Sequence, residues 1–361
     1  MPSPNSRPVP ARALATALTV CVALAVSVGC RVGSEPGTTP DGRPILRYQG
    51  TTGKVEPFEL AADLGYFRTI QLDWQGDSTS GPAMIQAVAT RQAELGSAFN
   101  GAVAKLIAGG AKATSVLSSY GADDQTFTGY FVRDGAAIGS ARDLIGKKVG
   151  VNTLGAPHEL ITREWLHRQG LSDDEIKQVQ FVVLPPVSTE DALRKGQIDL
   201  AALSDAYRDT AVARGGVHSL FTDKDLFGTF DYGSYVFRDE YIAEHPDAVH
   251  DFVQGTARAI RWMQVTPRDE VVARMAAIIG KRGRNESTRL LQYWHSSGIP
   301  VPGGVIEERE LQTWIDWLVR NGELRAGKLT ARDLYTNSDN PYADGTYAPT
   351  SGPTGEVVAA K

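Results

Sequence analysis

Cysteine is nearly absent from this sequence. Among 361 residues only Cys21 and Cys30 are cysteines, and both lie within the first thirty positions. The rest of the chain therefore has no thiol nucleophile, no cysteine-based metal site and no internal disulfide. The six histidines show neither the HExxH spacing of a zinc site nor a GxSxG serine partner. We predict no catalytic residue, no metal and no cofactor, and hence a protein that is not an enzyme.

The chain also lacks a basic excess. Its formal net charge is −5, and 22% of its residues are charged. A nucleic-acid partner would require a clustered basic face, so we exclude that class. An anionic ligand stays possible, because backbone amides at helix N-termini hold anions without any formal charge. With 42% hydrophobic residues, the composition is globular and the length suffices for two lobes.

The N-terminus has the pattern of a secretory signal, in which arginines precede a long apolar stretch. The stretch ends in SVGC, which resembles a bacterial lipoprotein cleavage site, although Ser27 stands where such signals usually have Leu. We predict a lipoprotein signal peptide over 1–29, acylation of Cys30 and a flexible linker over 30–43. The protein would then be held at the outer or periplasmic face of the cell membrane. The alternative, an uncleaved anchor, also places the remainder outside the cytoplasm.

From residue 44 onward, short apolar strands alternate with helical segments, a pattern typical of an α/β fold. A second strand–helix series begins near residue 147. The apolar segments 128–135 and 233–242 have the pattern of strands that cross between the two series. We predict two lobes, each a mostly parallel sheet flanked by helices. Lobe 1 comprises 44–130 and 230–335, lobe 2 comprises 131–229, and the Gly- and Pro-rich segment 336–361 is a disordered tail.

Several stretches resemble one protein family. LRYQGTTGKVEPFELAADLGYF, DLIGKKVGVN and the run from VVLPP to GQIDLAALSD resemble the extracytoplasmic substrate-binding proteins of ABC importers. The similarity is to the branch that serves nitrate, aliphatic sulfonates, taurine and thiamine-precursor pyrimidines. It implies a type II periplasmic-binding fold, in which two crossing strands join two lobes and a cleft holds a small polar or anionic molecule. It further implies a monomer that delivers this molecule to a membrane permease driven by a cytoplasmic ATPase.

Open α/β sheets bind ligands at the carboxyl ends of their strands, and residues 147–170 form one such strand–turn–helix unit. The first turn of the helix has free N–H groups that can hold an anion. Gly155 would let the backbone approach closely, and Thr153 adds a hydroxyl. On this reasoning, and on the resemblance, we predict ligand contacts from loop residues of both lobes: Thr51, Thr52, Ser80, Gly81, Asn100, Gly101, Thr153, Gly155, His158, Asp205, Tyr207 and Tyr232.

Each of these positions also has a purely structural interpretation. Ser80, Asn100 and Asp205 are residue types that cap helices, and His158 is of a type often found on helix surfaces. If Asp205 does face the ligand, its carboxylate favours an amine, a pyrimidine or a zwitterion over a simple sulfonate. Two other functions stay open. One is a sensory lipoprotein that signals to a membrane receptor. The other is a thiamine-pyrimidine enzyme, although such relatives carry a cysteine-rich motif that this chain lacks.

Overall fold

A computed structural model describes residues 37–358 of the protein. The predicted signal peptide, the acylation site Cys30 and the first half of the predicted linker lie outside the described residues. The second half of that linker is not an extended tether but a closed turn. In this turn the Thr39 N–H donates to the Arg43 carbonyl at 2.9 Å, and the Gly42 N–H donates to the Thr39 carbonyl at 2.8 Å.

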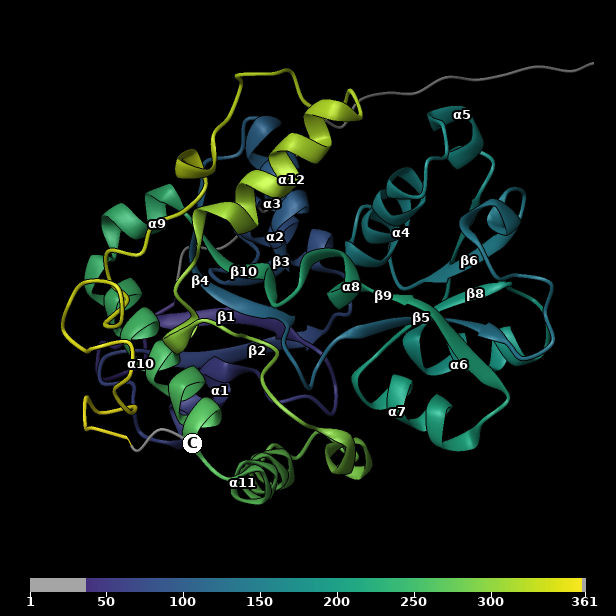
Figure 1. Cartoon of the computed structure of the whole chain (residues 1–361). Coiled ribbons are helices and arrows are strands. Elements are labelled where there is room, and N and C mark those ends of the chain that lie inside the picture. The colour runs from purple at the N-terminus through teal and green to yellow at the C-terminus, as the bar shows by residue number, and fades with distance from the viewer. Residues whose placement is uncertain (1–36, 359–361) are drawn as a thin grey trace, which may run out of the picture. The chain divides into compact units, whose positions relative to one another are not determined.

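The first lobe contains two groups of strands (Figure 1). Strands β1 (Ile45–Gly50) and β2 (Gln71–Asp77) pair in parallel, and β10 (Phe230–Arg238) lies antiparallel between β3 (Gly96–Phe99) and β4 (Ala113–Ala122). The α-helices of this lobe are α1 (Pro57–Asp63), α2 (Gly81–Ala89), α3 (Asn100–Ala108), α9 (Asp239–Glu244), α10 (Pro246–Val265), α11 (Arg268–Lys281) and α12 (Glu308–Arg320). Short 3-10 turns occupy Arg289–Tyr293, Pro302–Gly304 and Ala331–Asp333.

The second lobe is built on one five-stranded sheet of order β7-β6-β8-β5-β9. Strands β6 (Lys148–Val151), β7 (Gln180–Val183) and β8 (Leu200–Ser204) are parallel, whereas β5 (Thr128–Arg133) runs antiparallel to β8 and to β9 (Val217–Thr222). The helical segments are a 3-10 turn (Ala141–Leu144), α4 (Pro157–Arg168), α5 (Asp173–Ile176), α6 (Pro186–Arg194), α7 (Asp205–Arg214) and α8 (Asp223–Phe227).

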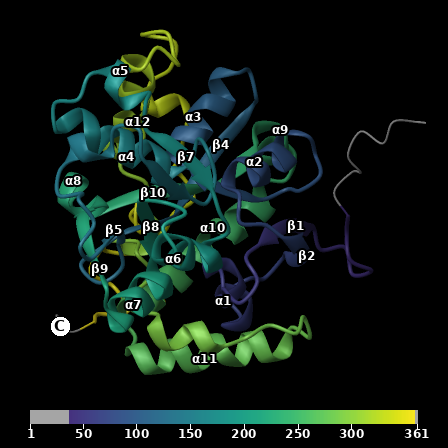
Figure 2. The same cartoon turned by 90° about the vertical axis from the view of Figure 1, so that its right-hand side faces the viewer.

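The period-two alternation of strand side chains explains how helices cover both faces of this sheet. Tyr130 of β5 packs in the same cluster as Trp165 of α4, and its neighbour Phe131 packs with Leu193 of α6 and Ala211 of α7. Helix α4 therefore lies on one face and α6 and α7 on the other, which Figure 2 shows from a direction that brings the second lobe to the front.

The two predicted crossing strands correspond to β5 and β10. Each is hydrogen bonded within one sheet, so the chain passes between the lobes in the short links 123–127 and 228–229. Because β5 and β10 run antiparallel to their neighbours, the sheets are not mostly parallel. The second lobe has one mixed sheet, and the first lobe has an antiparallel three-stranded sheet besides the parallel pair of β1 and β2.

The described part of the predicted disordered tail, residues 336–358, is folded against α10 (Figure 1). The prediction of disorder was wrong here. The Nε atoms of Arg258 and Arg261 donate to the carbonyls of Pro353 and Ser351 at 2.9 and 2.6 Å, and the buried Tyr342 hydroxyl donates to the Gly352 carbonyl at 2.9 Å. The segment is poor in apolar residues, so its composition suggested disorder. Arginines of a distant helix hold its backbone instead.

No helix in the part of the chain that the structure describes combines the length and the apolar character needed to cross a membrane.

Two carboxyl groups are buried together between β10 and α12. The Asp231 N–H donates to Glu310 Oε1 at 3.1 Å, and both side chains are fully buried. Burial, with the nearby Glu310 carboxylate, raises the pKa of Asp231 well above its ordinary value, and burial raises the pKa of Glu310 to about 7. The folded protein therefore retains protons that the unfolded chain releases at much lower pH.

We expect Asp231→Asn to stabilise the protein by an amount that grows with pH. An unfolded aspartate ionises near its ordinary pKa of 3.8, whereas the folded one keeps its proton. The free energy of unfolding therefore falls as pH rises above that value, by at most about 1.4 kcal/mol per pH unit. Asparagine cannot ionise, so the variant does not lose this free energy of unfolding as pH rises. Urea unfolding at acid and at mildly alkaline pH measures the difference, with Asp316→Asn on the exposed side of α12 as control. An equal effect of Asp231→Asn at both pH values would contradict the assignment.

Candidate functional site

A cavity of about 280 Å³ lies between the two lobes, where strands of both sheets end. From the first lobe it is lined by Tyr48, Gln49, Thr51, Lys54, Glu56, Ser97, Tyr120 and Tyr235, together with the start of α2. The second lobe contributes Asn152, Pro157, His158, Pro186, Ser204, Asp205 and Tyr207. Because polar groups of both lobes converge here and the walls enclose the space, this is the place where a small ligand fits.

Five of the twelve predicted contact residues line this cavity. They are Thr51, Gly81, His158, Asp205 and Tyr207. The other seven do not line it, and the hydrogen bonds and packing around them show how they are used instead.

In the first lobe, residues predicted to contact a ligand serve local structure. The Thr52 hydroxyl donates to Asp77 Oδ1 at 2.7 Å, and Ser80 Oγ accepts from the N–H of Ala83 as the cap of α2. Asn100 is buried and donates to the Asp231 carbonyl at 3.4 Å. Gly101 lies so close to the ring of Phe99 that a Cβ atom would come within 2.6 Å of it. For Ser80 the alternative interpretation, a helix cap, is the one that the structure supports.

In the second lobe, the predicted anion site at the start of α4 is occupied by the chain itself. Gly155 has a positive φ of 71°, as the tight turn requires. Its N–H donates to Glu159 Oε2 at 2.9 Å, so a carboxylate stands where an anion was expected. Thr153 does not line the cavity. Tyr232, predicted to contact the ligand, is instead buried among Phe227, Phe230 and Trp314, with ring centroids 5.3 to 6.4 Å apart.

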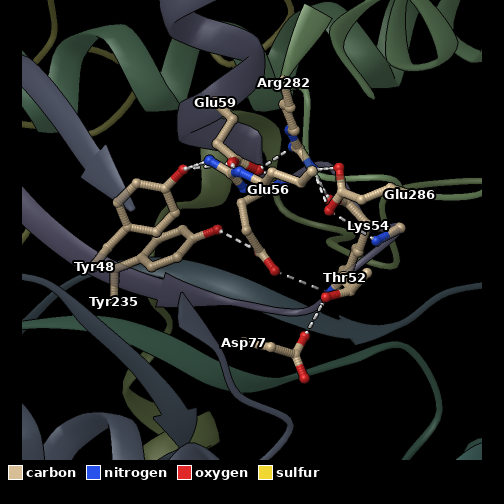
Figure 3. A network of polar contacts seen from close by, with 11 residues as sticks. Tyr48, Thr52, Lys54, Glu56, Glu59, Asp77, Tyr235, Arg282 and Glu286 are labelled. Carbon is tan, nitrogen blue, oxygen red and sulfur yellow. Dashed lines mark hydrogen bonds and ion pairs between the residues drawn. The ribbon is translucent and has the colours of Figure 1, made fainter. Parts of the chain in front are cut away.

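Three charged side chains face the cavity. Lys54 Nζ lies 3.8 Å from Glu56 Oε1, and Glu56 Oε2 accepts a hydrogen bond from the Tyr235 hydroxyl at 3.3 Å (Figure 3). Asp205 stands on the wall formed by the other lobe. Burial raises the pKa of Asp205 above its ordinary value, and the Lys54 ammonium partly offsets that effect. Glu56 raises the pKa of Lys54, whose side chain keeps 53% of its surface in contact with solvent inside the cleft.

Asp205 has an unusual backbone conformation, with a φ of 49° at the first position of α7. This left-handed region is disfavoured for most side chains, by about 1–2 kcal/mol, and aspartate and asparagine tolerate it best. Strained residues of this kind concentrate at functional sites, where the surrounding structure holds them. The strained position here is also one of the two acidic residues that line the cavity.

Two buried polar atoms of the second lobe, His158 Nδ1 and Asn152 Oδ1, have no hydrogen-bond partner among the described residues. Both side chains line the cavity. Burial lowers the pKa of His158 to about 4, so the ring is neutral at physiological pH. An unpaired buried polar group costs about 1–3 kcal/mol, and a ligand that bonds these atoms recovers this free energy.

The loop that carries Glu56 is anchored from behind (Figure 3). Glu59, in the first turn of α1, accepts hydrogen bonds from the Tyr48 hydroxyl and from Arg282, each at 2.5 Å, and from the Glu56 N–H at 2.9 Å. Arg282 also pairs with Glu286 at 3.2 Å, and all three charged side chains are buried. These contacts fix where the Glu56 carboxylate points.

Sequence reasoning missed Lys54, Glu56 and Asn152 as cavity residues. The sequence predicts that the loop containing Lys54 and Glu56 contacts the ligand, but it assigns these contacts to the two threonines that precede Lys54. A signal was available, because Glu56 directly precedes Pro57 and so stands at a helix start after the end of β1. No group of three or more potential metal ligands occurs within residues 37–358.

Comparison with known proteins places this geometry in a family. Residues 54–270 match the family model described as NMT1/THI5 like. A protein of Escherichia coli (strain K12), whose name places it among aliphatic sulfonates-binding proteins, is 26% identical over 201 residues, which are 56% of this chain. The chain spans only 60% of that relative's length.

Solved structures share the fold over most of the chain. The periplasmic aliphatic sulphonate binding protein SsuA of Escherichia coli has a TM-score of 0.60 at 20% identity, covering 80% of this chain and 91% of its own. The periplasmic nitrate-binding protein NrtA of Synechocystis PCC 6803 has a TM-score of 0.65 at 13% identity, covering 89% and 93%. These matches confirm the predicted periplasmic-binding fold. Because the family match covers more than half of the sequence, this chain belongs to the NMT1/THI5-like family.

Proposed function

We propose that this protein is the extracytoplasmic solute-binding component of an ABC importer. It binds a small polar molecule between its lobes and delivers it to a membrane permease, whose cytoplasmic ATPase drives uptake. The ligand classes considered are a sulfonate, taurine, a nitrate-like anion or a pyrimidine precursor. The observation that carries the proposal is the cavity itself, in which polar side chains from both lobes face a volume suited to one small molecule. The names of the relatives, which bind sulfonate or nitrate, agree with this role.

Binding is coupled to lobe movement in this proposal. A ligand that bonds to both walls gains all its contacts only when the lobes are closed, so it shifts the population toward that form. The link 123–127 is tied to the second lobe, because Arg208 of α7 donates to the carbonyls of Phe127 and Gln125 at 2.9 and 3.1 Å. The same helix begins with Asp205. A contact made at the cavity therefore acts on an element that is bonded to the hinge.

No chemical step is part of this proposal. The closed, loaded form is what the permease would recognise, and the membrane anchor on Cys30 would keep the protein near it. This association needs no oligomer, and we propose that the protein acts as a monomer.

We expect the protein, purified from its own host, to carry a small molecule, and Tyr207→Ala to release it. Tyr207 is a partly buried wall residue of the second lobe. Losing its contact area costs on the order of 1.5–3 kcal/mol, or at least about tenfold in affinity. Native mass spectrometry measures the bound fraction. Tyr293→Ala, a tyrosine that does not line the cavity, is the control. A chain that carries no ligand, and binds none from a host extract, would contradict the proposed function.

We expect Cys30→Ser to move the protein from the membrane fraction to the soluble extracytoplasmic fraction. Without the thiol there is no acyl chain to insert, so only the alternative, an uncleaved apolar anchor, would keep the protein on the membrane. Immunoblots of fractionated cells measure the distribution. Cys21→Ser changes the sequence's one other cysteine and should leave the protein on the membrane. Equal membrane association of both variants would show that the anchor is not a lipid on Cys30.

A further inference from the structure

We propose that the cavity selects a ligand with a cationic nitrogen group, which Glu56 and Asp205 bind from opposite lobes, and that it rejects simple anions. This inference rests on the proposed function, because it names the ligand class of the same site.

The charge balance of the cavity wall is the first argument. Two carboxylates and one ammonium face the cavity, and no arginine lines it within the described part of the chain. The ammonium of Lys54 is already beside Glu56, at 3.8 Å. Lys54 also acts on Asp205, so two carboxylates share one ammonium and the wall carries one net negative charge. A cationic group on the ligand is attracted to this wall, and an anionic group is repelled by it.

The helix starts around the cavity are the second argument. Helix N-termini ordinarily attract anions through free N–H groups and the positive end of the helix dipole. Four helices that begin beside this cavity, α1, α2, α4 and α6, have proline in their first two positions, which removes one N–H from each. Helix α7 begins with Asp205 itself.

Acidic side chains also stand at the starts of α1 and α4. Glu56 is the cap of α1, and Glu159 accepts the hydrogen bond of the Gly155 N–H at the start of α4. Proline and these acidic side chains thus reduce the number of backbone N–H groups that could hold a sulfonate or nitrate at these helix starts.

The unpaired atoms of the second lobe are the third argument. Asn152 Oδ1 can only accept a hydrogen bond, and a neutral His158 ring has one accepting nitrogen. An N–H group of the ligand satisfies Asn152 Oδ1, whereas the oxygens of a sulfonate do not, and His158 Nδ1 accepts in the same way in the tautomer that carries its proton on Nε2. Tyr120 and Tyr207 also line the cavity, and tyrosine rings attract cations.

A matched pair of probes tests the selectivity. Benzylamine and benzenesulfonate share an aromatic ring and differ in the sign of their charge, and nitrate serves as a small anion. We expect calorimetric titration of ligand-free protein to show benzylamine binding at least tenfold tighter than either anion. Tighter or equal binding of an anion would overturn the inference and leave the proposed function standing.

The molecule that co-purifies with the protein is the second readout, and it decides the case even when no probe binds. A basic nitrogen in that molecule supports the inference, and its absence overturns the inference alone. Only a protein that carries no ligand, and binds none from a host extract, would overturn the proposed function itself.

Two charge-neutralising variants test the residue assignment. Asparagine tolerates the left-handed backbone of Asp205, so Asp205→Asn removes the charge and keeps the conformation. We expect Asp205→Asn and Glu56→Gln each to weaken benzylamine binding at least tenfold, and Asp205→Asn also to strengthen benzenesulfonate binding. Asp174→Asn, whose side chain is 90% exposed on α5, is the control. An unchanged ratio of amine to sulfonate affinity in both cavity variants would refute the role of these carboxylates.

Discussion

The free N–H groups at helix starts impose the constraint on which this site depends. Parallel strands deliver several helices to one cavity edge, and each helix would bring unpaired donors and a positive dipole end. This chain reduces the number of these donors with its own residues. Proline begins α4 and α6, and Glu159 takes the Gly155 N–H. The strand ends thus create a polar cavity. The charge that its wall presents to a ligand is set by side chains and not by the backbone.

A second layer of buried charge keeps those side chains in place. Glu59 and Arg282 come from segments more than two hundred residues apart, yet they pair behind the loop that carries Lys54 and Glu56. Removing one partner of such a buried pair generally costs about 3–5 kcal/mol, because the other charge is left without compensation. The geometry of the cavity therefore depends on the packing of α1 against α11, and a change far from the ligand can alter ligand affinity.

Relatives with the same fold differ in what their names say they bind, a sulfonate in one case and nitrate in another. Structures that are only 13–20% identical to this chain share its fold over most of its length. A fold of this kind supplies a cleft at the strand ends, and the residues around it supply the chemistry. Asp205 and Glu56 are the two acidic residues that line the cavity of this chain.

The sequence by itself determined the elements of this fold, because the alternation in β1 and the strand–proline–helix order at β6 and α4 are local patterns. It also selected His158, Asp205 and Tyr207, which line the cavity, since they follow strand ends. Only the tertiary structure decided that Tyr232 packs against Trp314, that Thr52 bonds to Asp77, and that arginines of α10 hold the C-terminal segment. Such contacts join residues far apart in the chain, and no local pattern records which side chain will arrive opposite another.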